Sequence, residues 1–353
     1  MAEKYQYLLQ VVLESKASAN LFAGHVQYAG GGSRTDAVRV DENQIELKCE
    51  RVSLIDLDGV FVNYQSAIYN QMAKGISFHI CAMQAIPEVK KITLTAKRGN
   101  VKIKEKIIGA DELNNSVRLL SKFKANFNLK SLEIIFSESE KSSEVLKAIS
   151  YLIRSKTKGD PFDRFDSLWK AYNSIYRAIG KKKTDHECQV ALRSFILKHH
   201  AASQTATDMV SGMTAKELRS KLRWRALILN DYENFAKTEA FSKFILRYTD
   251  ARIMEVFQEI LPYRQNFLSD AGLLGKVEQH IEKNVKSAVV SDAEVTALIC
   301  IKYMYFIRNK SAHGERLDRI IGLGTKETKE VKWLSDLLEA LIIDLINVNH
   351  LYH

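Results

Sequence analysis

Residues 160–180 read DPFDRFDSLWKAYNSIYRAIG, and the pattern of the sequence changes at this stretch. Asp160 before Pro161 is a strong helix start, because Asp accepts hydrogen bonds from the first amides and Pro is favoured at the first helical position. Apolar residues then recur at spacings of three and four, which places them on one helical face. They are Phe162, Phe165, Trp169, Tyr172, Ile175, Tyr176 and Ile179. Gly180 ends the predicted helix.

From this helix onward the sequence predicts helices only. Strand signals fade after residue 160, and helical periodicity continues to the end of the chain. The further predicted helices span residues 187–199, 215–229, 240–260, 276–287, 292–308 and 326–351. We therefore expect an all-α helical bundle over residues 160–353.

The sequence before this point predicts a mixed domain. Runs rich in β-branched and apolar residues predict strands at 5–13, 44–57 and 132–136 and a hairpin over 91–107. Helical patterns span 66–85, 115–127 and 142–153. The stretch 155–159, SKTKG, is polar and unpatterned, and we place the domain boundary there. The expected fold class is an α+β domain over residues 1–155 followed by the helical domain.

The composition indicates an anionic partner. The chain of 353 residues has 52 Lys and Arg against 42 Asp and Glu, a formal net charge of +10. Such a surplus favours nucleic acid or a phosphorylated ligand. The cysteines, Cys49, Cys81, Cys188 and Cys300, are far apart and form no C-x-x-C pair, so neither a disulfide framework nor a zinc cluster is expected.

The start of the chain lacks the charged and apolar segments of a secretory signal, and no apolar run has the length to span a membrane. We expect a cytoplasmic protein with no membrane partner. We also expect no cofactor and no metal site, because the sequence holds none of the usual carboxylate clusters.

The motif that suggests chemistry is RNKSAH, residues 308–313, at the end of a strongly apolar helix. RNA carries its own nucleophile, the 2′-hydroxyl, so a cleaving enzyme needs a base, an acid and positive charge at the phosphate. His313 suits the base or the acid near neutral pH. Arg308 can bind two phosphate oxygens, and Asn309 can orient the phosphate or the ribose. The motif therefore predicts RNA cleavage that requires no metal.

The spacing of the motif constrains its geometry. Five residues along a continuous helix turn about 140° and rise about 7.5 Å, so Arg308 and His313 would not converge on one phosphate. Either the helix breaks between them, or two copies of the motif meet across a two-fold interface. The second arrangement predicts a homodimer.

The stretch YFIRNKSAHGE, residues 305–315, resembles the HEPN superfamily, and FDSLW at 165–169 with Tyr172 and Asn173 is similar to the opening helix of such domains. These helical ribonuclease domains occur in bacterial toxins, abortive-infection proteins and RNA-targeting CRISPR effectors. The resemblance implies a dimer in which Arg and His of both copies line one cleft. It implies that Arg308, Asn309 and His313 are catalytic, and that the role is antiviral defence, by abortive infection, or toxin-like.

Several alternatives stay open. The motif is also compatible with a helix C-terminus that carries an exposed His. Arg193 followed by His199 and His200 satisfies the looser spacing of the family motif, but lies inside a predicted helix and lacks the Asn. Three functions therefore stay open. The protein is an endoribonuclease, a non-catalytic helical module that binds RNA, nucleotide or a protein partner, or a structural scaffold.

A basic run supplies the other candidate RNA contacts. On one continuous helix, Lys216, Arg219 and Arg223 would share a face, with Trp224 beside them. Lys310 within the motif is a further candidate. The competing interpretation is a solvated basic face with Trp224 in the core. The domain over 1–155 is expected to sense an activating ligand or a phage or protein trigger.

Overall fold

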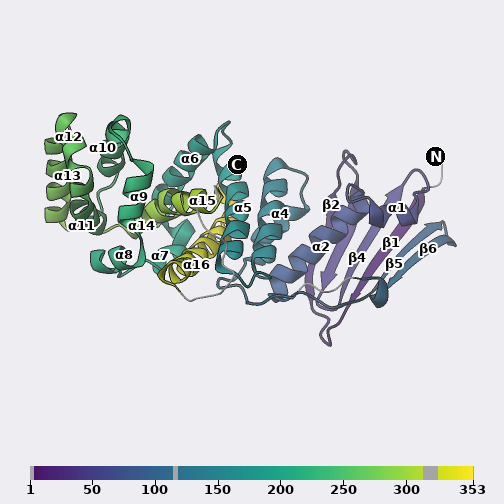
Figure 1. Ribbon diagram of the computed structural model, residues 1–353. Helices are drawn as coiled ribbons and strands as arrows, with labels where there is room; N and C mark the ends of the chain where they lie inside the picture. The colour runs from purple at the N-terminus through teal and green to yellow at the C-terminus, as the bar shows by residue number, and fades with distance from the viewer. Residues whose placement is uncertain (1–3, 114–117, 313–324, 353) are drawn as a thin grey trace. The chain divides into compact units, whose positions relative to one another are not determined.

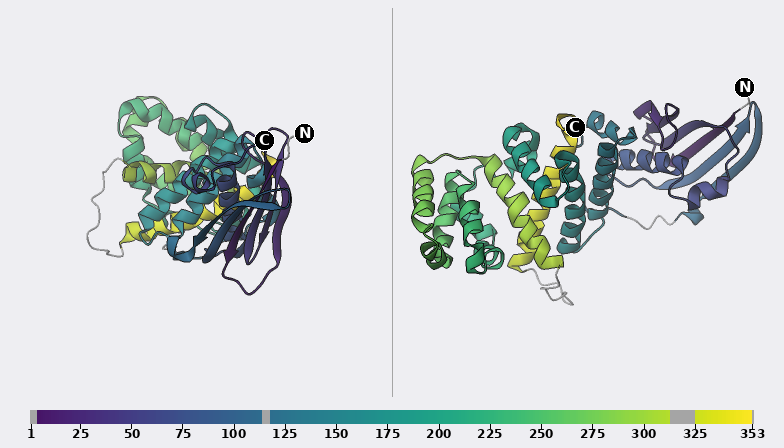
Figure 2. Two further views of the ribbon diagram at one scale, coloured as in Figure 1. Left: turned by 90° about the vertical axis from the view of Figure 1, so that its right-hand side faces the viewer. Right: turned by 90° about the horizontal axis from the view of Figure 1, so that it is seen from above.

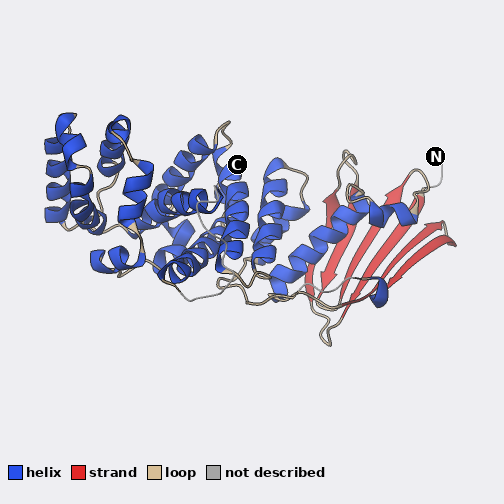
Figure 3. Ribbon diagram, in the orientation of Figure 1, coloured by secondary structure: helices blue, strands red, loops and turns tan. Residues whose placement is uncertain are grey.

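The computed structural model describes residues 4–113, 118–312 and 325–352. The chain forms two compact units, the first made of residues 1–181 and 345–353 and the second of residues 182–344 (Figure 1). The described part of the first unit contains a sheet and helices, and that of the second unit contains only helices (Figure 3). The expected sequence of an α+β region followed by a helical region is confirmed at this level.

The sheet of the first unit has six antiparallel strands in the order β2-β3-β4-β1-β5-β6. Their bounds are β1 Tyr5–Leu13, β2 Asn20–Gln27, β3 Thr35–Asp41, β4 Gln44–Arg51, β5 Val89–Arg98 and β6 Val101–Gly109. In the central strand β1, Tyr7, Leu9, Val11 and Leu13 are buried, whereas the residues between them are half-buried or exposed. This alternation gives the sheet one covered face.

Two helices, α1 (Leu57–Val62) and α2 (Ala67–Met83), follow β4. Helix α2 lies against one face of the sheet (Figure 2). Gly75 of α2 permits a close approach there, because a Cβ at this position would lie 2.9 Å from the Ile45 side chain. Phe22 of β2 stacks on Phe136 at 4.2 Å between ring centroids and so extends the core beyond α2.

The first unit continues with α3 (Leu129–Leu132), η2 (Glu133–Phe136), α4 (Glu140–Ser155) and α5 (Pro161–Gly180). Helices α4 and α5 pack along one another. The expected boundary at 155–159 is therefore a turn inside the first unit. The C-terminal segment with η7 (Asn349–Leu351) returns to this unit, where the Asn349 side chain donates to the Ser131 carbonyl at 2.7 Å.

The second unit is a set of helices, most of them short. They are α6 (Asp185–Lys198), η3 (His200–Ser203), α7 (Gln204–Asp208), α8 (Ala215–Lys221), α9 (Trp224–Asp231), η4 (Phe235–Lys237), α10 (Thr238–Leu246), α11 (Ala251–Ile260), η5 (Leu261–Tyr263), α12 (Gln265–Asp270), α13 (Leu274–Ser287), α14 (Asp292–Ala297), η6 (Leu298–Tyr303), α15 (Met304–Ala312) and most of α16 (Lys326–Asn347). The predicted helix 240–260 is two helices, because Asp250 caps the start of α11.

Three local predictions in the first unit were wrong. The expected strand 132–136 is helical, and its apolar residues Ile135 and Phe136 are buried as a short helical turn. The expected helix 115–127 has no helix in its described part, residues 118–127. The expected strand 44–57 ends at Arg51, and Asp56 instead caps α1 through the amides of Asp58 and Gly59. The sequence patterns did not predict strands β2 and β3.

The described helices contain no segment that combines the length and the apolar character needed to cross a membrane.

Candidate functional site

Residues 308–312 of the motif lie on α15, which continues α14 and η6 without a break. The six residues of η6 form a π-helix, whose wider turns are common at functional sites. Leu298, Ile299, Cys300 and Tyr303 of this segment are buried. The extra residue in a π turn shifts the direction of later side chains by roughly 100°. The buried π segment thus sets the direction in which the motif side chains leave the helix.

Arg308 and Asn309 are adjacent and half-buried, and Arg308 Nη1 donates to Asn309 Oδ1 at 3.2 Å. Lys310 is also half-buried. His313 lies outside the described residues, so the relation between Arg308 and His313 is not described. Helix α15 runs through Arg308 to Ala312. A helix break within residues 308–312, one of the two arrangements expected from the spacing, is therefore absent.

A buried polar network anchors the base of this helix. The Tyr303 hydroxyl donates to Glu330 of α16 and accepts from the Arg223 amide at 2.6 Å. Arg223 Nε donates to Glu330 at 2.7 Å, and its Nη2 lies 3.2 Å from Glu327. Burial alone would lower the pKa of Arg223, but Glu330, Tyr303 and Glu327 together outweigh it and raise the pKa. Burial, followed by the Glu330 charge, raises the pKa of Tyr303. The network ties η6 and α16 to the α8–α9 corner.

The basic run does not form a single RNA-binding face. Helix α8 ends at Lys221 and α9 begins at Trp224, so Arg223 lies in a corner rather than on a continuous helix with Lys216. Lys216 is exposed, whereas Arg219 is in an ion pair with Glu259. Trp224 is 3% exposed, and its indole N–H donates to the Leu218 carbonyl at 3.1 Å. Trp224 therefore belongs to the core, where its ring cannot stack on a base.

The second unit holds a pocket of about 430 Å³ that we call the α6–α10 pocket. Ile301, Lys302 and Tyr305 of the motif-bearing helix line one side of it. Five cationic side chains also line it, namely Arg193, Lys237, Lys243, Arg247 and Lys302, against two carboxylates, Asp185 and Asp231. The sequence did not reveal this pocket, because its cations come from separate segments. The only signal was Arg193, noted as part of an alternative motif.

Two of these cations are neutralised. Lys302 lies 2.5 Å from Asp231 and over the Tyr232 ring, and Lys243 lies 2.7 Å from Glu239. Neither Lys237 nor Arg247 forms an ion pair with any described residue.

Arg193 has no carboxylate partner in the described chain either. Its Nη2 donates to the Arg247 carbonyl at 3.0 Å, and its guanidinium lies 5.2 Å from the centre of the Tyr248 ring. Its Nε is buried without an acceptor. The pocket therefore combines uncompensated positive charge with an unsatisfied donor.

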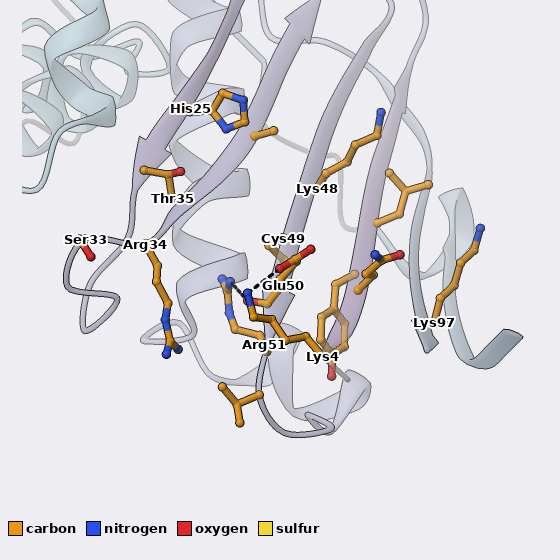
Figure 4. Close-up of a pocket in the computed structure, with 15 residues that line it drawn as sticks. Lys4, His25, Ser33, Arg34, Thr35, Lys48, Cys49, Glu50, Arg51 and Lys97 are labelled. Carbon is orange, nitrogen blue, oxygen red and sulfur yellow. Dashed lines mark hydrogen bonds and ion pairs between the residues drawn. The ribbon is translucent and has the colours of Figure 1, made fainter. Parts of the chain in front are cut away.

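A second pocket, of about 660 Å³, lies on the sheet of the first unit (Figure 4). Most of its cations have partners: Lys4 contacts Glu50 at 3.0 Å, and Arg51 contacts the buried Asp36 at 2.7 Å. Arg34 and Lys97, which lie on opposite sides of the pocket in Figure 4, form no ion pair with a described residue. Burial raises the pKa of the Cys49 thiol to about 12, so this residue is not a reactive thiolate near neutral pH.

No protein-family model, curated protein or solved structure matches this chain. Within the residues that the structure describes, no group of three or more His, Cys, Asp and Glu side chains is arranged to hold a metal ion.

Proposed function

We propose that this chain is a metal-independent endoribonuclease of the HEPN type that acts as a homodimer in the cytoplasm. The observation that carries the proposal is the Arg308–Asn309 pair on a helix fixed in the core. The two side chains are hydrogen-bonded at 3.2 Å, and the π segment and the Tyr303–Glu330 contact hold the helix that presents them. Rigid placement of charged groups is what phosphodiester cleavage requires.

The continuity of α15 supports the dimer. Because the helix runs without a break to Ala312, one copy of the motif spreads its polar groups around the helix. A second copy related by a two-fold axis would bring a further Arg308 and His313 to the same phosphate. Half of each active site would then come from each copy.

The chemical step in this proposal uses no group beyond the motif and the RNA. The His313 side chain of one copy accepts the proton of the ribose 2′-hydroxyl, and a bond forms between O2′ and phosphorus. The bond between phosphorus and O5′ breaks, and the His313 side chain of the other copy supplies a proton to O5′. Arg308 neutralises the charge on the phosphate oxygens, and Asn309 orients the guanidinium. The products are a 2′,3′-cyclic phosphate and a 5′-hydroxyl.

The test is an RNA cleavage assay in the presence of EDTA, with the chemistry of both new ends determined. We expect wild-type protein to produce 2′,3′-cyclic phosphate ends. Arg308→Ala and His313→Ala should each reduce the rate by about 10²- to 10⁴-fold. The matched controls are Lys283→Ala on α13 and His200→Ala in the alternative motif; both should cleave like wild type. Activity that survives in Arg308→Ala, or that EDTA abolishes, contradicts the proposal.

The alternative is a non-catalytic helical module that binds RNA, nucleotide or a protein partner. The cationic α6–α10 pocket favours this function as much as it favours the enzyme. The same assay separates the two, because a binder retains RNA but yields no new RNA ends.

The biological role in the proposal is antiviral defence by abortive infection, or a toxin-like role. The first unit is then the part that responds to an activating ligand or to a phage or protein trigger. The pocket on its sheet supports a ligand-binding role, because Arg34 and Lys97 are available there for an anionic group.

A further inference from the structure

The α6–α10 pocket lies beside the motif on the same helix. Tyr305 lines the pocket, and Arg308 and Asn309 follow it by three and four residues within α15. Residues at these spacings are neighbours on one side of a helix, with Cβ atoms about 5–6 Å apart. An RNA chain bound at Arg308 would therefore reach the pocket over a distance of about one helical turn, about 5.4 Å along the helix axis.

The charge of the pocket fits a polyanion. Its lining has five cations and two carboxylates, a formal surplus of three positive charges. Arg193, Lys237 and Arg247, the lining cations that form no ion pair with a described residue, come from three separate segments of the second unit. Cations gathered without carboxylate partners repel one another, and an anion bound between them relieves that repulsion.

The chemistry of these side chains favours phosphate. Arg193 and Arg247 are planar guanidinium donors that match two phosphate oxygens at once. The buried Nε of Arg193 lacks an acceptor, and an unsatisfied buried donor is rare in a folded protein. Because the Nε itself is buried, a phosphate would supply the opposite charge from the outer edge of this guanidinium.

The aromatic side chain at the pocket distinguishes a nucleic acid from a simple phosphate. Tyr305 is 38% exposed, whereas Tyr232, Phe244 and Tyr248 are buried in the pocket walls. An exposed ring beside cations is the arrangement that binds a base and its backbone in single-stranded nucleic acid. A concave pocket of about 430 Å³ has the size of a small-molecule site and excludes a rigid duplex.

We propose that the α6–α10 pocket binds the backbone of single-stranded RNA next to the bond that is cleaved at Arg308, with phosphate on Arg193, Lys237 and Arg247 and a base on Tyr305. This inference rests on the proposed ribonuclease function for the position of the cleaved bond, but not for the binding itself. It assigns to the enzyme a substrate-binding site that lies outside the motif.

The test measures binding separately from cleavage. The probe is a fluorescent single-stranded RNA with 2′-O-methyl groups on every ribose, which lacks the nucleophilic hydroxyl and so cannot be cut. Fluorescence anisotropy gives its affinity for the full-length protein at several salt concentrations. The variants are Lys237→Glu and Arg247→Glu, whose side chains are exposed and whose substitution leaves the core intact. The matched control is Lys283→Glu, an exposed lysine of α13 outside the pocket.

We expect each pocket variant to bind the probe at least about tenfold more weakly than wild type. The slope of log affinity against log salt concentration should decrease by the amount that corresponds to about one phosphate contact. Lys283→Glu should bind like wild type. Arg308→Ala should retain pocket-dependent binding although it does not cleave. Tyr305→Ala should weaken binding and Tyr305→Phe should preserve it, because only the ring is needed for stacking.

The inference is overturned if both pocket variants bind the probe as tightly as wild type, or if the wild-type protein does not bind it. Equal competition by free AMP and by the RNA at the same nucleotide concentration would also overturn it, because the pocket would then be a mononucleotide site. Pocket-dependent binding of RNA by a protein that cleaves none would sustain the inference and refute the ribonuclease proposal.

Discussion

Two groups of charged side chains in the helical unit, one around Arg223 and one around Arg193 and Arg247, differ in whether the arginines have carboxylate partners. Arg223 faces two carboxylates, with its Nε 2.7 Å from Glu330 and its Nη2 3.2 Å from Glu327. Arg193 and Arg247 line a pocket and form no ion pair with a described residue. A guanidinium that is fully engaged by acidic neighbours contributes to the fold. A guanidinium left without them at a cavity is available for an anionic ligand.

The difference also assigns separate effects to the two groups. Changes at Arg223 and its partners should affect the free energy of unfolding and leave RNA affinity unchanged. Changes at Lys237 and Arg247 should affect RNA affinity and leave the free energy of unfolding unchanged.

The largest effect on stability is expected for Glu330→Ala. This carboxylate is 1% exposed and engages both the Tyr303 hydroxyl and Arg223, whose side chain is 35% exposed. Its removal leaves the buried Tyr303 hydroxyl without its acceptor and leaves the Arg223 Nε without its carboxylate. Loss of one partner of a fully buried pair costs about 3–5 kcal/mol, and the exposure of Arg223 reduces this to about 2–4 kcal/mol. Denaturant unfolding measures the change.

Glu327→Ala is the matched control, because Glu327 contacts the same arginine but is 32% exposed. It should cost less than about 1 kcal/mol. If both variants have the same free energy of unfolding, the contact between Glu330 and Arg223 does not stabilise the fold.

An intermediate effect should follow from the titration of Tyr303. Burial and the Glu330 charge raise the pKa of this phenol above its unfolded value, so its contribution is complete below about pH 10 and is lost as the pH rises. Tyr303→Phe lacks this titration. The free energy of unfolding of wild type, relative to that of the variant, should therefore fall by about 1.4 kcal/mol between pH 9 and pH 11. Unfolding curves at matched pH values measure this shift, and a constant difference across the range would refute it.

A smaller effect on stability than that of Glu330→Ala is expected for Trp224→Phe. The indole N–H donates to the Leu218 carbonyl at 3.1 Å, and the ring packs 5.6 Å from that of Tyr303. Phenylalanine keeps most of the apolar contact but loses the hydrogen bond, so the variant should be destabilised by about 0.5–1.5 kcal/mol. Its affinity for single-stranded RNA should equal that of wild type. A loss of RNA affinity without a loss of stability would return Trp224 to the list of RNA contacts.

The local sequence was sufficient to predict a mixed region followed by a helical one, and most of the long helices. It placed the change near residue 160, whereas the last strand of the described chain ends at Gly109. Asp160 caps α5 through the amides of Phe162 and Asp163, as its position before Pro161 predicted. Strands β2 and β3 escaped prediction, because Gly24 and His25 weaken the β pattern of the first and the charged residues Asp36, Arg39 and Asp41 interrupt that of the second. Pairing with neighbouring strands makes them strands.

The candidate RNA contacts show the limit of local patterns more clearly. Arg223 and Trp224 appeared together in a basic run, but Arg223 binds a carboxylate more than one hundred residues later in the chain. The α6–α10 pocket likewise joins Arg193, Lys237 and Arg247, which no local spacing relates. Only tertiary structure decides whether a given arginine meets a carboxylate or a cavity.

The measurement that tests the central claim most directly is the activity of a defined heterodimer. Co-expression of two differently tagged chains yields dimers with one wild-type copy and one Arg308→Ala/His313→Ala copy. If both motifs form one composite site, this heterodimer should be as inactive as the doubly substituted homodimer. A heterodimer with about half the wild-type rate, or a wild-type monomer that cleaves RNA, would contradict the account.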